Sequence, residues 1–423
     1  MGFRVLPSGT AITLDNLTIP ACLLGEPGDL TTTSITIEDG KIAEFPSTNR
    51  VDLDGAFVLP AFVDMHTHLD KGHIWARSPN PDGTFMGALN TVAEDRAANW
   101  SAEDVHARMT FALKCAYAHG TRALRTHLDS IPPQDDISWP VFDQVRSEWA
   151  GKIDLQAACL APSDKADLSG DFGHTADLVE KYGGVLGLVT FPMDGLDHVL
   201  TAFFERAGKA GIDADFHVDE TMDASVETLR TIAEVKMQIG YFGRVTVGHC
   251  CSLSVQDEAR AMDTLDLVAK ARLDVVSLPM CNLFLQDRHA NRTPRNRGVT
   301  LVHEMRARGI NVSFASDNTR DPFYAYGDLD MLEVMRQATR IAHLDHSAHD
   351  WPKAFSANPA AAMGIADQPF APGQPADMVI CNAREWTELY SRPQSDRIVI
   401  RGGTEIDTTL PDYRELDPYV RTS

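Results

Sequence analysis

Short apolar runs alternate with segments of helical periodicity from residue 62 onward. Eight of these runs have the length and the apolar character of strands buried on both faces. They cover residues 62–68, 123–129, 153–161, 185–191, 212–218, 244–250, 273–279 and 310–316. After the first run, Ser101 can cap a helix in which Val105, Met109, Ala112 and Ala116 recur at helical spacing. Eight repeats of strand and helix predict an α/β fold built on a (β/α)8 TIM barrel rather than an open doubly wound sheet.

The two ends of the chain have a different pattern. Residues 3–58 carry alternating runs separated by DG turns, and residues 370–408 carry PADMVICN and RIVIRGGTEI. We expect both ends to form one small β domain, interrupted in sequence by the barrel. The predicted division is residues 1–58 and 369–423 for a flanking β-sandwich domain and residues 59–368 for the barrel. The terminal DPYVRTS is polar, and we expect it to be frayed.

Composition and charge limit the classes of partner. Apolar residues make up 43% of the chain and charged residues 23%, which is typical of a globular protein. The formal net charge of -22 opposes binding to nucleic acid polymers and acidic membranes. Seven scattered cysteines without CxxC pairs indicate reduced thiols and a cytoplasmic location. Neither a signal peptide nor a membrane-spanning run is recognisable. We expect a small-molecule substrate, no membrane association, and assembly as a homo-oligomer.

The first predicted barrel strand carries two histidines, His66 and His68, in the sequence HTH. Residues two apart in a strand point to the same side, so both imidazoles can bind one metal ion. An HxH pair also occurs by chance in buried strands, as ordinary core histidines. The pair alone is therefore a modest indication of a metal site.

Further polar residues end three other predicted strands. His217 and Glu220 lie at the end of the fifth, His249 ends the sixth, and Asp317 follows the eighth. Barrel enzymes keep their active sites at the C-terminal ends of the strands. Burial of such groups is unfavourable unless they are paired or bind a metal. A hydrogen-bonded structural histidine at 249 and a helix-capping aspartate at 317 are the alternatives, but the combination predicts a metal-dependent active site.

The residue types suggest a division of roles. One divalent metal ion is expected to bind four side chains, leaving a coordination position for water and lowering the pKa of that water toward about 7. The predicted ligands are His66, His68, His217 and Asp317. Attack on a ring carbon also needs an acid that is not a ligand, and Glu220 fits that role. His249 could stabilise the developing oxygen anion, and Asp317 could carry a proton to the leaving amine.

Other polar residues near these strands have several interpretations. His127 and Asp129 end the second strand and could support the metal ligands or serve a structural role. Lys71 and His73 follow the first ligand pair and could line the mouth of the site. A second metal ion would need a carboxylated lysine on a middle strand, and the fourth strand, VLGLVTFP, has none. The sequence therefore predicts one metal ion per chain.

Several segments resemble the cytosine deaminase branch of the amidohydrolase superfamily. They are PAFVDMHTHLD, ALRTHLD, HVDE, VTVGHC, NLFLQDR with TPRNRGVTLVHEM, and SDNTRDPFYAYGDLDMLEV. These segments are spread over nearly the whole chain. The resemblance implies a distorted (β/α)8 barrel with a flanking β domain and one Fe2+, Zn2+ or similar ion. It also implies the roles given above for the ligands, for Glu220 and for His249.

Three positions differ from the cytosine deaminase pattern. Pro162 or Ser163 stands where those enzymes keep a glutamine, Asn318 replaces a second aspartate, and Phe323 replaces a tryptophan. We predict Ser163, Asn318 and Phe323 as substrate-binding residues. Because unpaired polar groups discriminate strongly between ring substrates, these differences argue against cytosine as the preferred substrate.

The motifs predict a hydrolytic deaminase that releases ammonia from an aminated nitrogen heterocycle, such as a cytosine-like pyrimidine, a purine, a pterin or a triazine-like ring. An alternative is hydrolysis of a cyclic amide or of an N-alkylated ring amine of the ammelide type. Ammonia release distinguishes the two. A third hypothesis is a non-catalytic relative that serves binding or assembly, but such a protein is expected to have lost the ligands that are present here.

Overall fold

The computed structural model describes residues 3, 4, 6, 11–366 and 368–421. Eight parallel strands form its centre, and all eight strands predicted for the barrel are confirmed, with ends that differ by at most three residues. They are β6 (Phe62–Thr67), β7 (Thr121–Asp129), β8 (Asp154–Leu160), β9 (Leu186–Thr190), β10 (Ala214–Val218), β11 (Val245–His249), β12 (Asp274–Ser277) and β13 (Val312–Phe314). The runs were recognisable because each strand is buried almost throughout.

The parallel strands belong to two sheets, one ordered β6-β7-β8 and the other β13-β12-β11-β10-β9. Isolated parallel bridges also occur between the sheets. Ala158 pairs with Val185 and Pro162 with Val189 on one side, while Thr67 pairs with Asp317 on the other. The C-terminal ends of the strands therefore face a common region.

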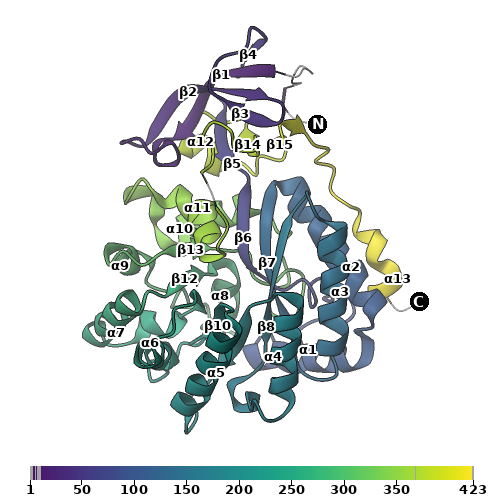
Figure 1. Ribbon diagram of the computed structural model, residues 1–423, viewed down its shortest axis with the longest axis vertical. Coiled ribbons are helices and arrows are strands. Elements are labelled where there is room, and N and C mark those ends of the chain that lie inside the picture. Colours follow the sequence, from purple (N-terminus) through teal and green to yellow (C-terminus); the bar gives the residue numbers. More distant parts are fainter. Residues whose placement is uncertain (1–2, 5, 7–10, 367, 422–423) are drawn as a thin grey trace.

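Helices alternate with these strands and lie on the outside of them (Figure 1). None of the described helices is both long enough and apolar enough to cross a membrane. Their bounds are α1 (Phe85–Asn99), α2 (Ala102–His119), α3 (Asp135–Glu148), α4 (Asp171–Tyr182), α5 (Leu196–Ala210), α6 (Thr228–Ile239), α7 (Glu258–Ala271), α8 (Pro279–Leu285), α9 (Val302–Ala307), α10 (Met331–Ala342) and α11 (Ala357–Ala362).

The predicted helix after Ser101 is confirmed as α2. The Ser101 hydroxyl accepts a hydrogen bond from the Asp104 amide at 3.2 Å, and Gly120, with φ of 98°, ends the helix in the left-handed conformation. The predicted apolar stripe is buried, as expected for an amphipathic helix that packs on a sheet. Its members are Val105, Met109, Ala112 and Ala116.

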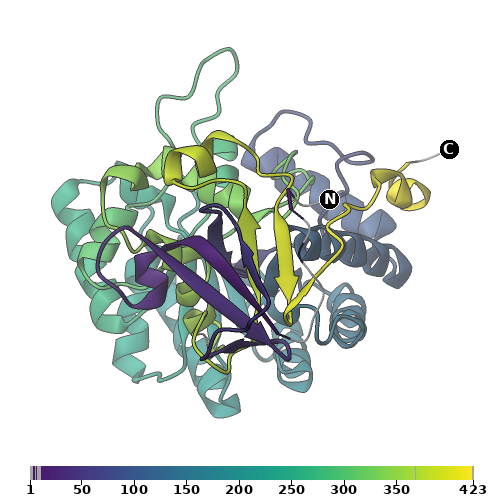
Figure 2. The same ribbon diagram turned by 90° about the horizontal axis from the view of Figure 1, so that it is seen from above.

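Strands from both chain ends meet in an eight-stranded mixed sheet above the barrel strands (Figures 1 and 2). β14 pairs antiparallel with β5 and so joins the two ends of the chain, as the sequence predicted. The sheet contains β1 (Ala11–Pro20), β2 (Leu30–Glu38), β3 (Lys41–Ala43), β4 (Arg50–Asp52), β5 (Phe57–Pro60), β14 (Met378–Cys381), β15 (Ile398–Arg401) and β16 (Thr404–Glu405). The short helix α12 (Trp386–Ser391) lies between β14 and β15.

The C-terminal segment differs from the expectation of a frayed end. Leu416 and Val420, the latter in the short helix α13 (Asp417–Val420), are buried against Phe111 and Cys115 of α2. This apolar contact explains why the segment is ordered as far as α13 and why it leaves the small sheet to lie against a helix of the barrel region.

Candidate active site

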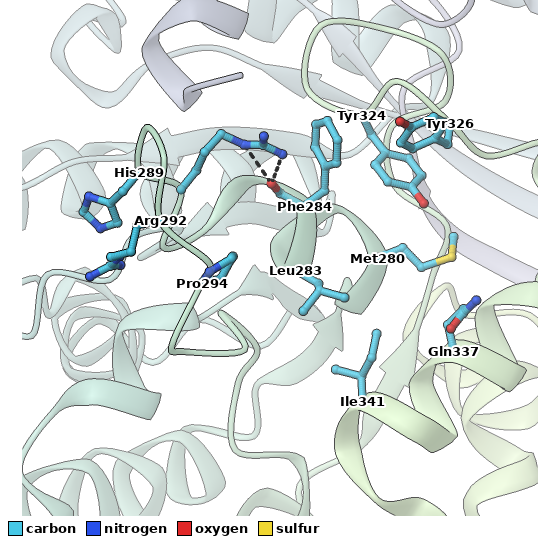
Figure 3. A pocket seen from close by; sticks show the side chains of 11 residues that line it. Met280, Leu283, Phe284, His289, Arg292, Pro294, Tyr324, Tyr326, Gln337 and Ile341 are labelled. Carbon is cyan, nitrogen blue, oxygen red and sulfur yellow. Dashed lines mark hydrogen bonds between the residues drawn. The ribbon is translucent and has the colours of Figure 1, made fainter. Parts of the chain in front are cut away.

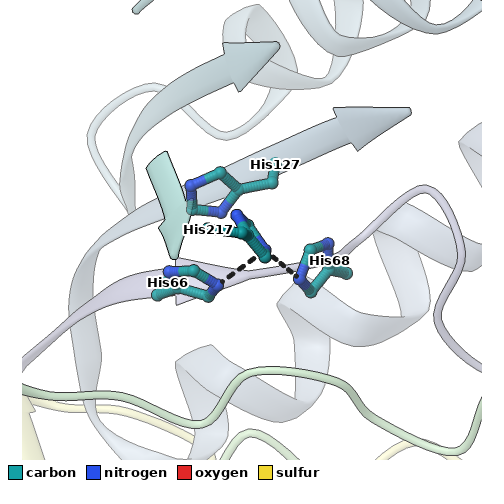
Figure 4. A group of neighbouring side chains, drawn as sticks. All are labelled: His66, His68, His127 and His217. Atoms are coloured by element: carbon teal, nitrogen blue, oxygen red, sulfur yellow. Dashed lines mark hydrogen bonds between the residues drawn. The ribbon is translucent and has the colours of Figure 1, made fainter. Parts of the chain in front are cut away.

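Three histidines meet at the C-terminal ends of β6 and β10. His66 lies in β6, His68 follows it by two residues on the same side, and His217 lies in β10 (Figure 4). Nε2 of His217 is 3.1 Å from Nε2 of His66 and 3.3 Å from Nε2 of His68. All three side chains are buried. The predicted histidine ligands therefore present their Nε2 atoms to a single point.

Asp317 completes this group from the segment after β13. Its Oδ1 lies 3.2 Å from Nε2 of His68 and 3.5 Å from Nε2 of His66. The backbone places it there: the Asp317 amide donates to the His66 carbonyl at 2.9 Å, and Asp317 has a φ of 65°. A positive φ is uncommon for an aspartate and is typical of residues held in place at functional sites.

The electrostatics of this group match a bound cation. Burial lowers the pKa values of His66, His68 and His217 well below the ordinary range, so the imidazoles are neutral. The neighbouring histidines and, for His68, the charge of Lys71 add to this effect. Neither carboxylate oxygen of Asp317 has a hydrogen-bond partner among the described residues. Several buried lone pairs that face one another need a positive charge between them. Three neutral imidazoles and a carboxylate are also a normal donor set for a divalent transition metal.

Glu220 and His249 lie beside this group. Burial raises the pKa of Glu220 well above its ordinary value, and the charge of Asp317 adds to this effect. Burial lowers the pKa of His249 to about 3, so its ring is neutral. Nδ1 of His249 is 3.4 Å from Oε1 of Glu220, and Nε2 has no partner among the described residues. The structure thus brings a carboxyl group of raised pKa and a neutral imidazole to the ligand group.

Hydrogen bonds at the end of β10 fix the position of Glu220. The carboxylate of the preceding Asp219 accepts hydrogen bonds from the backbone amides of Thr228 and Leu229 at the start of α6. Backbone amides at a helix start lack partners within the helix, so a carboxylate is stabilised there. Glu220 follows directly, held between β10 and α6.

Two residues of the site escaped the sequence analysis. Nδ2 of Asn282, on α8, lies 3.0 Å from Nδ1 of His249 and 3.2 Å from Oε1 of Glu220. Nε2 of Gln286 donates to the Glu220 carbonyl at 3.3 Å. The two residues are four apart, which places them on one side of a helical turn, and this spacing within NLFLQDR was the available signal.

His127 packs beside the predicted ligand histidines. Its ring centroid is 4.0 Å from that of His66, and its Nε2 lies 3.0 Å from Oδ1 of Asp215. The other carboxylate oxygen of Asp215 accepts from Arg125 at 2.8 Å. His127 is thus fixed by a buried ion pair and packs against a predicted ligand, which fits the supporting role considered for it.

A cavity of about 560 Å³ opens onto this group. Its lining includes His68, His217, Glu220 and His249 together with apolar side chains from α1, including Phe85, Leu89 and Val92. Of the predicted substrate-binding residues, Asn318 and Phe323 line the cavity.

Ser163, the third predicted substrate-binding residue, lies outside the cavity wall. Its hydroxyl accepts from the Phe191 amide at 3.2 Å, its side chain is buried, and it is not part of the cavity wall. The chain forms a tight turn at Ser163–Lys165 after β8, which directs Ser163 inward. Pro162, Asp164 and Lys165 line the cavity instead.

Comparison with known proteins places this arrangement in a family. The model of the Amidohydrolase family matches residues 50–134 and 146–407. The chain belongs to the Amidohydrolase family. This result confirms the resemblance inferred from the sequence motifs, and divalent-metal dependence agrees with the donor set described above.

Known proteins resemble this amidohydrolase over two thirds or more of its length. It is 50% identical over 431 residues to pterin deaminase from Rhizobium rhizogenes (strain K84), covering 99% of each chain. It is 24% identical over 301 residues to N-isopropylammelide isopropyl amidohydrolase from Pseudomonas sp. (strain ADP), covering 67% of this chain and 69% of that one. Its fold matches 5-methylcytosine deaminase from Klebsiella pneumoniae with a TM-score of 0.78 at 24% identity, over 95% and 98% of the two chains.

The amidohydrolase has a second cavity, of about 490 Å³, on another side of α8 (Figure 3). Met280, Leu283 and Phe284 line it from α8 at helical spacing, whereas Asn282 on the same helix contacts Glu220. None of the predicted metal ligands lines this second cavity. The group of histidines and Asp317 therefore identifies the first cavity as the candidate active site.

Proposed function

We propose that this amidohydrolase removes the exocyclic amino group of pterin-type rings, which are 2-amino-4-oxopteridines, by hydrolysis, with release of ammonia. The observation that carries the proposal is the 50% identity with a pterin deaminase over 99% of both chains. Because the match covers 99% of this chain, it spans the segments that supply the histidine group, Glu220 and the cavity wall.

The cavity supports a fused bicyclic ring. Its volume of about 560 Å³ lies within the range of small-molecule sites, and its walls are mainly apolar with a few polar groups. Pro162 lines the wall near the position where cytosine deaminases keep a glutamine. A proline side chain offers no hydrogen bond to a pyrimidine amide edge, which argues against cytosine as the preferred substrate.

We assign four side chains as the metal ligands: His66, His68, His217 and Asp317. A divalent ion such as Fe2+ or Zn2+ supplies Lewis acidity that makes water a nucleophile near neutral pH. Glu220, whose pKa is raised by burial, donates a proton to the ring nitrogen next to the amino-bearing carbon. This transfer makes the carbon more electron-poor and so promotes addition of water.

His249 supplies a hydrogen bond to the oxygen that adds to the ring carbon. Asn282 lies within hydrogen-bonding distance of Nδ1 of His249 as a donor, and a neutral imidazole that accepts at Nδ1 carries its proton on Nε2. Nε2 is the nitrogen without a protein partner among the described residues. The donor is therefore set before substrate binds, which is the arrangement expected for stabilising a developing negative charge.

The test is ammonia release by enzyme reconstituted separately with Fe(II) and Zn(II). The substrates are 2-amino-4-oxopteridine, cytosine, 5-methylcytosine and an N-alkylaminotriazine. We expect ammonia from the pteridine with a higher kcat/KM than from either pyrimidine. Release of an alkylamine from the triazine, with no ammonia from the pteridine, would replace the proposal with the N-alkyl amine hydrolysis named for a more distant relative.

The parallel bridges between the two sheets support closure of the eight strands into one barrel. The proposed domains remain residues 59–368 for the barrel and residues 1–58 and 369–423 for a β-sandwich domain, except that α13 packs on the barrel side. The homo-oligomeric state and the cytoplasmic location stay predictions from the sequence.

A further inference from the structure

A buried lysine lines the candidate active site close to the metal ligands. Lys71 follows His68 by three residues, is 4% exposed, and borders the same cavity as His68, His217 and Glu220. Its Nζ lies 2.7 Å from Oδ1 of Asp129, at the end of β7. The mechanism above gives this cation no role. Burial of a lysine is unfavourable unless its ammonium group is well paired.

Asp129 pairs with a second cation besides Lys71. Oδ2 of Asp129 also pairs with Nη1 of Arg96 at 2.7 Å, so one carboxylate is shared by two cations. Burial by itself lowers the pKa of Lys71, but the charge of Asp129 raises it above the ordinary value, so Lys71 stays charged. An ammonium group has three N–H donors. The contact with Asp129 therefore leaves donors of Lys71 for a ligand.

The surroundings of Lys71 indicate where a ring would lie. The Lys71 ammonium is 5.5 Å from the ring centroid of Phe323, and Phe85 meets Phe323 edge-on with centroids 5.5 Å apart. Both aromatic residues line the cavity. A flat heterocycle against these apolar walls would bring its edge toward Lys71, while Glu220 and the histidine group contact the part of the ring that reacts.

We propose that Lys71, positioned by Asp129, binds the ring carbonyl oxygen of the substrate and thereby selects rings that carry an oxo group beside the aminated part of the ring. This assignment rests on the proposed deaminase function and deepens it. A carbonyl oxygen accepts hydrogen bonds, whereas an amino group at the same position directs its own donors at the ammonium. The ammonium also withdraws electron density from the lactam, which makes the amino-bearing carbon easier to attack.

Lys71→Met removes the ammonium group without leaving an unpaired buried carboxylate, because Asp129 keeps Arg96 as a counterion. Lys71→Arg retains a cation at the same place. Lys209→Met is the matched control: Lys209 carries the same charge, but it is exposed in the last turn of α5 and does not border the cavity. Metal content and thermal unfolding show whether each variant is folded and loaded.

The activity experiment compares 2-amino-4-oxopteridine with 2,4-diaminopteridine, in which an amino group replaces the carbonyl. For the wild type we expect kcat/KM for the oxo compound to be higher by about 100-fold or more. Lys71→Met should lose about 10- to 100-fold on the oxo compound and little on the diamino compound, so that the preference collapses. Lys71→Arg should keep the preference, even where kcat/KM falls, and Lys209→Met should keep both the preference and kcat/KM.

A binding experiment separates this proposal from the proposed function. The fluorescence of the product 2,4-dioxopteridine reports its Kd for the metal-loaded protein without any turnover. We expect Lys71→Met to raise this Kd by about tenfold or more and Lys209→Met to leave it within a factor of about three. Wild type that binds the dione through Lys71 but releases no ammonia would refute the deaminase function alone. Equal Kd values for wild type and folded Lys71→Met would overturn the role of Lys71.

Discussion

The side-chain nitrogen of Asn282 lies 3.0 Å from Nδ1 of His249. The same nitrogen lies 3.2 Å from Oε1 of Glu220, so one amide group spans the two residues proposed to act on the substrate. An NH2 group has two protons and can serve both contacts. Asn282 is therefore a positioning residue: it fixes the tautomer of His249 and the orientation of Glu220 without contacting the substrate in this arrangement.

Replacing Asn282 by leucine should lower kcat about 10- to 100-fold, because the side-chain shape is nearly kept while both hydrogen bonds are lost. The metal content and the Kd of 2,4-dioxopteridine should change little, since neither the ligands nor the cavity wall is altered. Steady-state kinetics and metal analysis check this. Leu283→Ala on the other face of α8 is the control for disturbance of the helix. An unchanged kcat in Asn282→Leu would show that His249 and Glu220 are positioned by other contacts.

Replacing Glu220 by glutamine should leave about one metal ion per chain and lower kcat by about 10²-fold or more, because the proton donor is removed while the ligands stay. Metal analysis and ammonia release are measured on the same preparation. Glu234→Gln in α6 is a suitable control, since this side chain is half exposed and forms only a long contact with Arg230, at 3.5 Å. Near-normal turnover in Glu220→Gln would remove Glu220 from the mechanism.

Gly248 in β11 leaves room for a ligand histidine. A Cβ at this position would lie 3.0 Å from Cε1 and 3.3 Å from Nδ1 of His66, closer than such contacts normally are. Gly248→Ala should displace the His66 ring and weaken metal binding about tenfold or more, as changes that misorient a ligand do. Competition with a chromogenic chelator measures the affinity.

Gly208→Ala provides the matched control for Gly248→Ala. Gly208 lies in α5, and an added Cβ would meet only Tyr241, at 3.7 Å. Alanine is the better helix former, so this variant should be at least as stable as the wild type and bind metal equally well. Equal metal affinity in both variants would mean that the His66 ring does not depend on the space beside β11.

The parallel strands and the clustering of His66, His68 and His217 could be predicted from the sequence because both signals are local. Each strand is a short apolar run, and His66, His68 and His217 lie within those runs. The convergence of these residues followed from the rule that parallel strands place their C-terminal ends together. The place of Asp317 beside them could be predicted for the same reason, since it lies three residues after the end of β13.

The remaining parts of the site depend on contacts between distant segments. Asn282 meets Glu220 across 62 positions, and nothing near either residue in sequence shows that contact. Ser163 was assigned from its place after β8, but the backbone turn there decides which side chain faces the cavity. The contact of Leu416 with α2 was missed because a short polar-looking terminus carries too few apolar residues to form a recognisable pattern.

The pair Asp330 and Arg397 joins the barrel region to the small sheet. Asp330 caps α10 by accepting from the Leu332 amide, and both of its oxygens pair with the Arg397 guanidinium at 2.7 Å, just before β15. Burial alone would raise the pKa of Asp330 above its ordinary value of 3.8. The charges of Arg397 and His119 outweigh this effect and lower the pKa to about 2. The ionised carboxylate therefore stabilises the folded state.

Because the folded-state pKa of Asp330 is the lower one, its contribution is complete above about pH 4 and is lost as the pH falls toward 2. The shift corresponds to about 2 kcal/mol of unfolding free energy. Asp330→Asn should destabilise the protein by about 3 kcal/mol at pH 7, since it leaves Arg397 buried without a counterion. Urea unfolding at pH 7, 5, 4 and 3 should show the gap between wild type and variant narrowing below pH 4. Asp263→Asn, on the exposed side of α7, is the control and should unfold with the same free energy as the wild type at every pH. A difference between wild type and Asp330→Asn that stays constant down to pH 3 would contradict the lowered pKa.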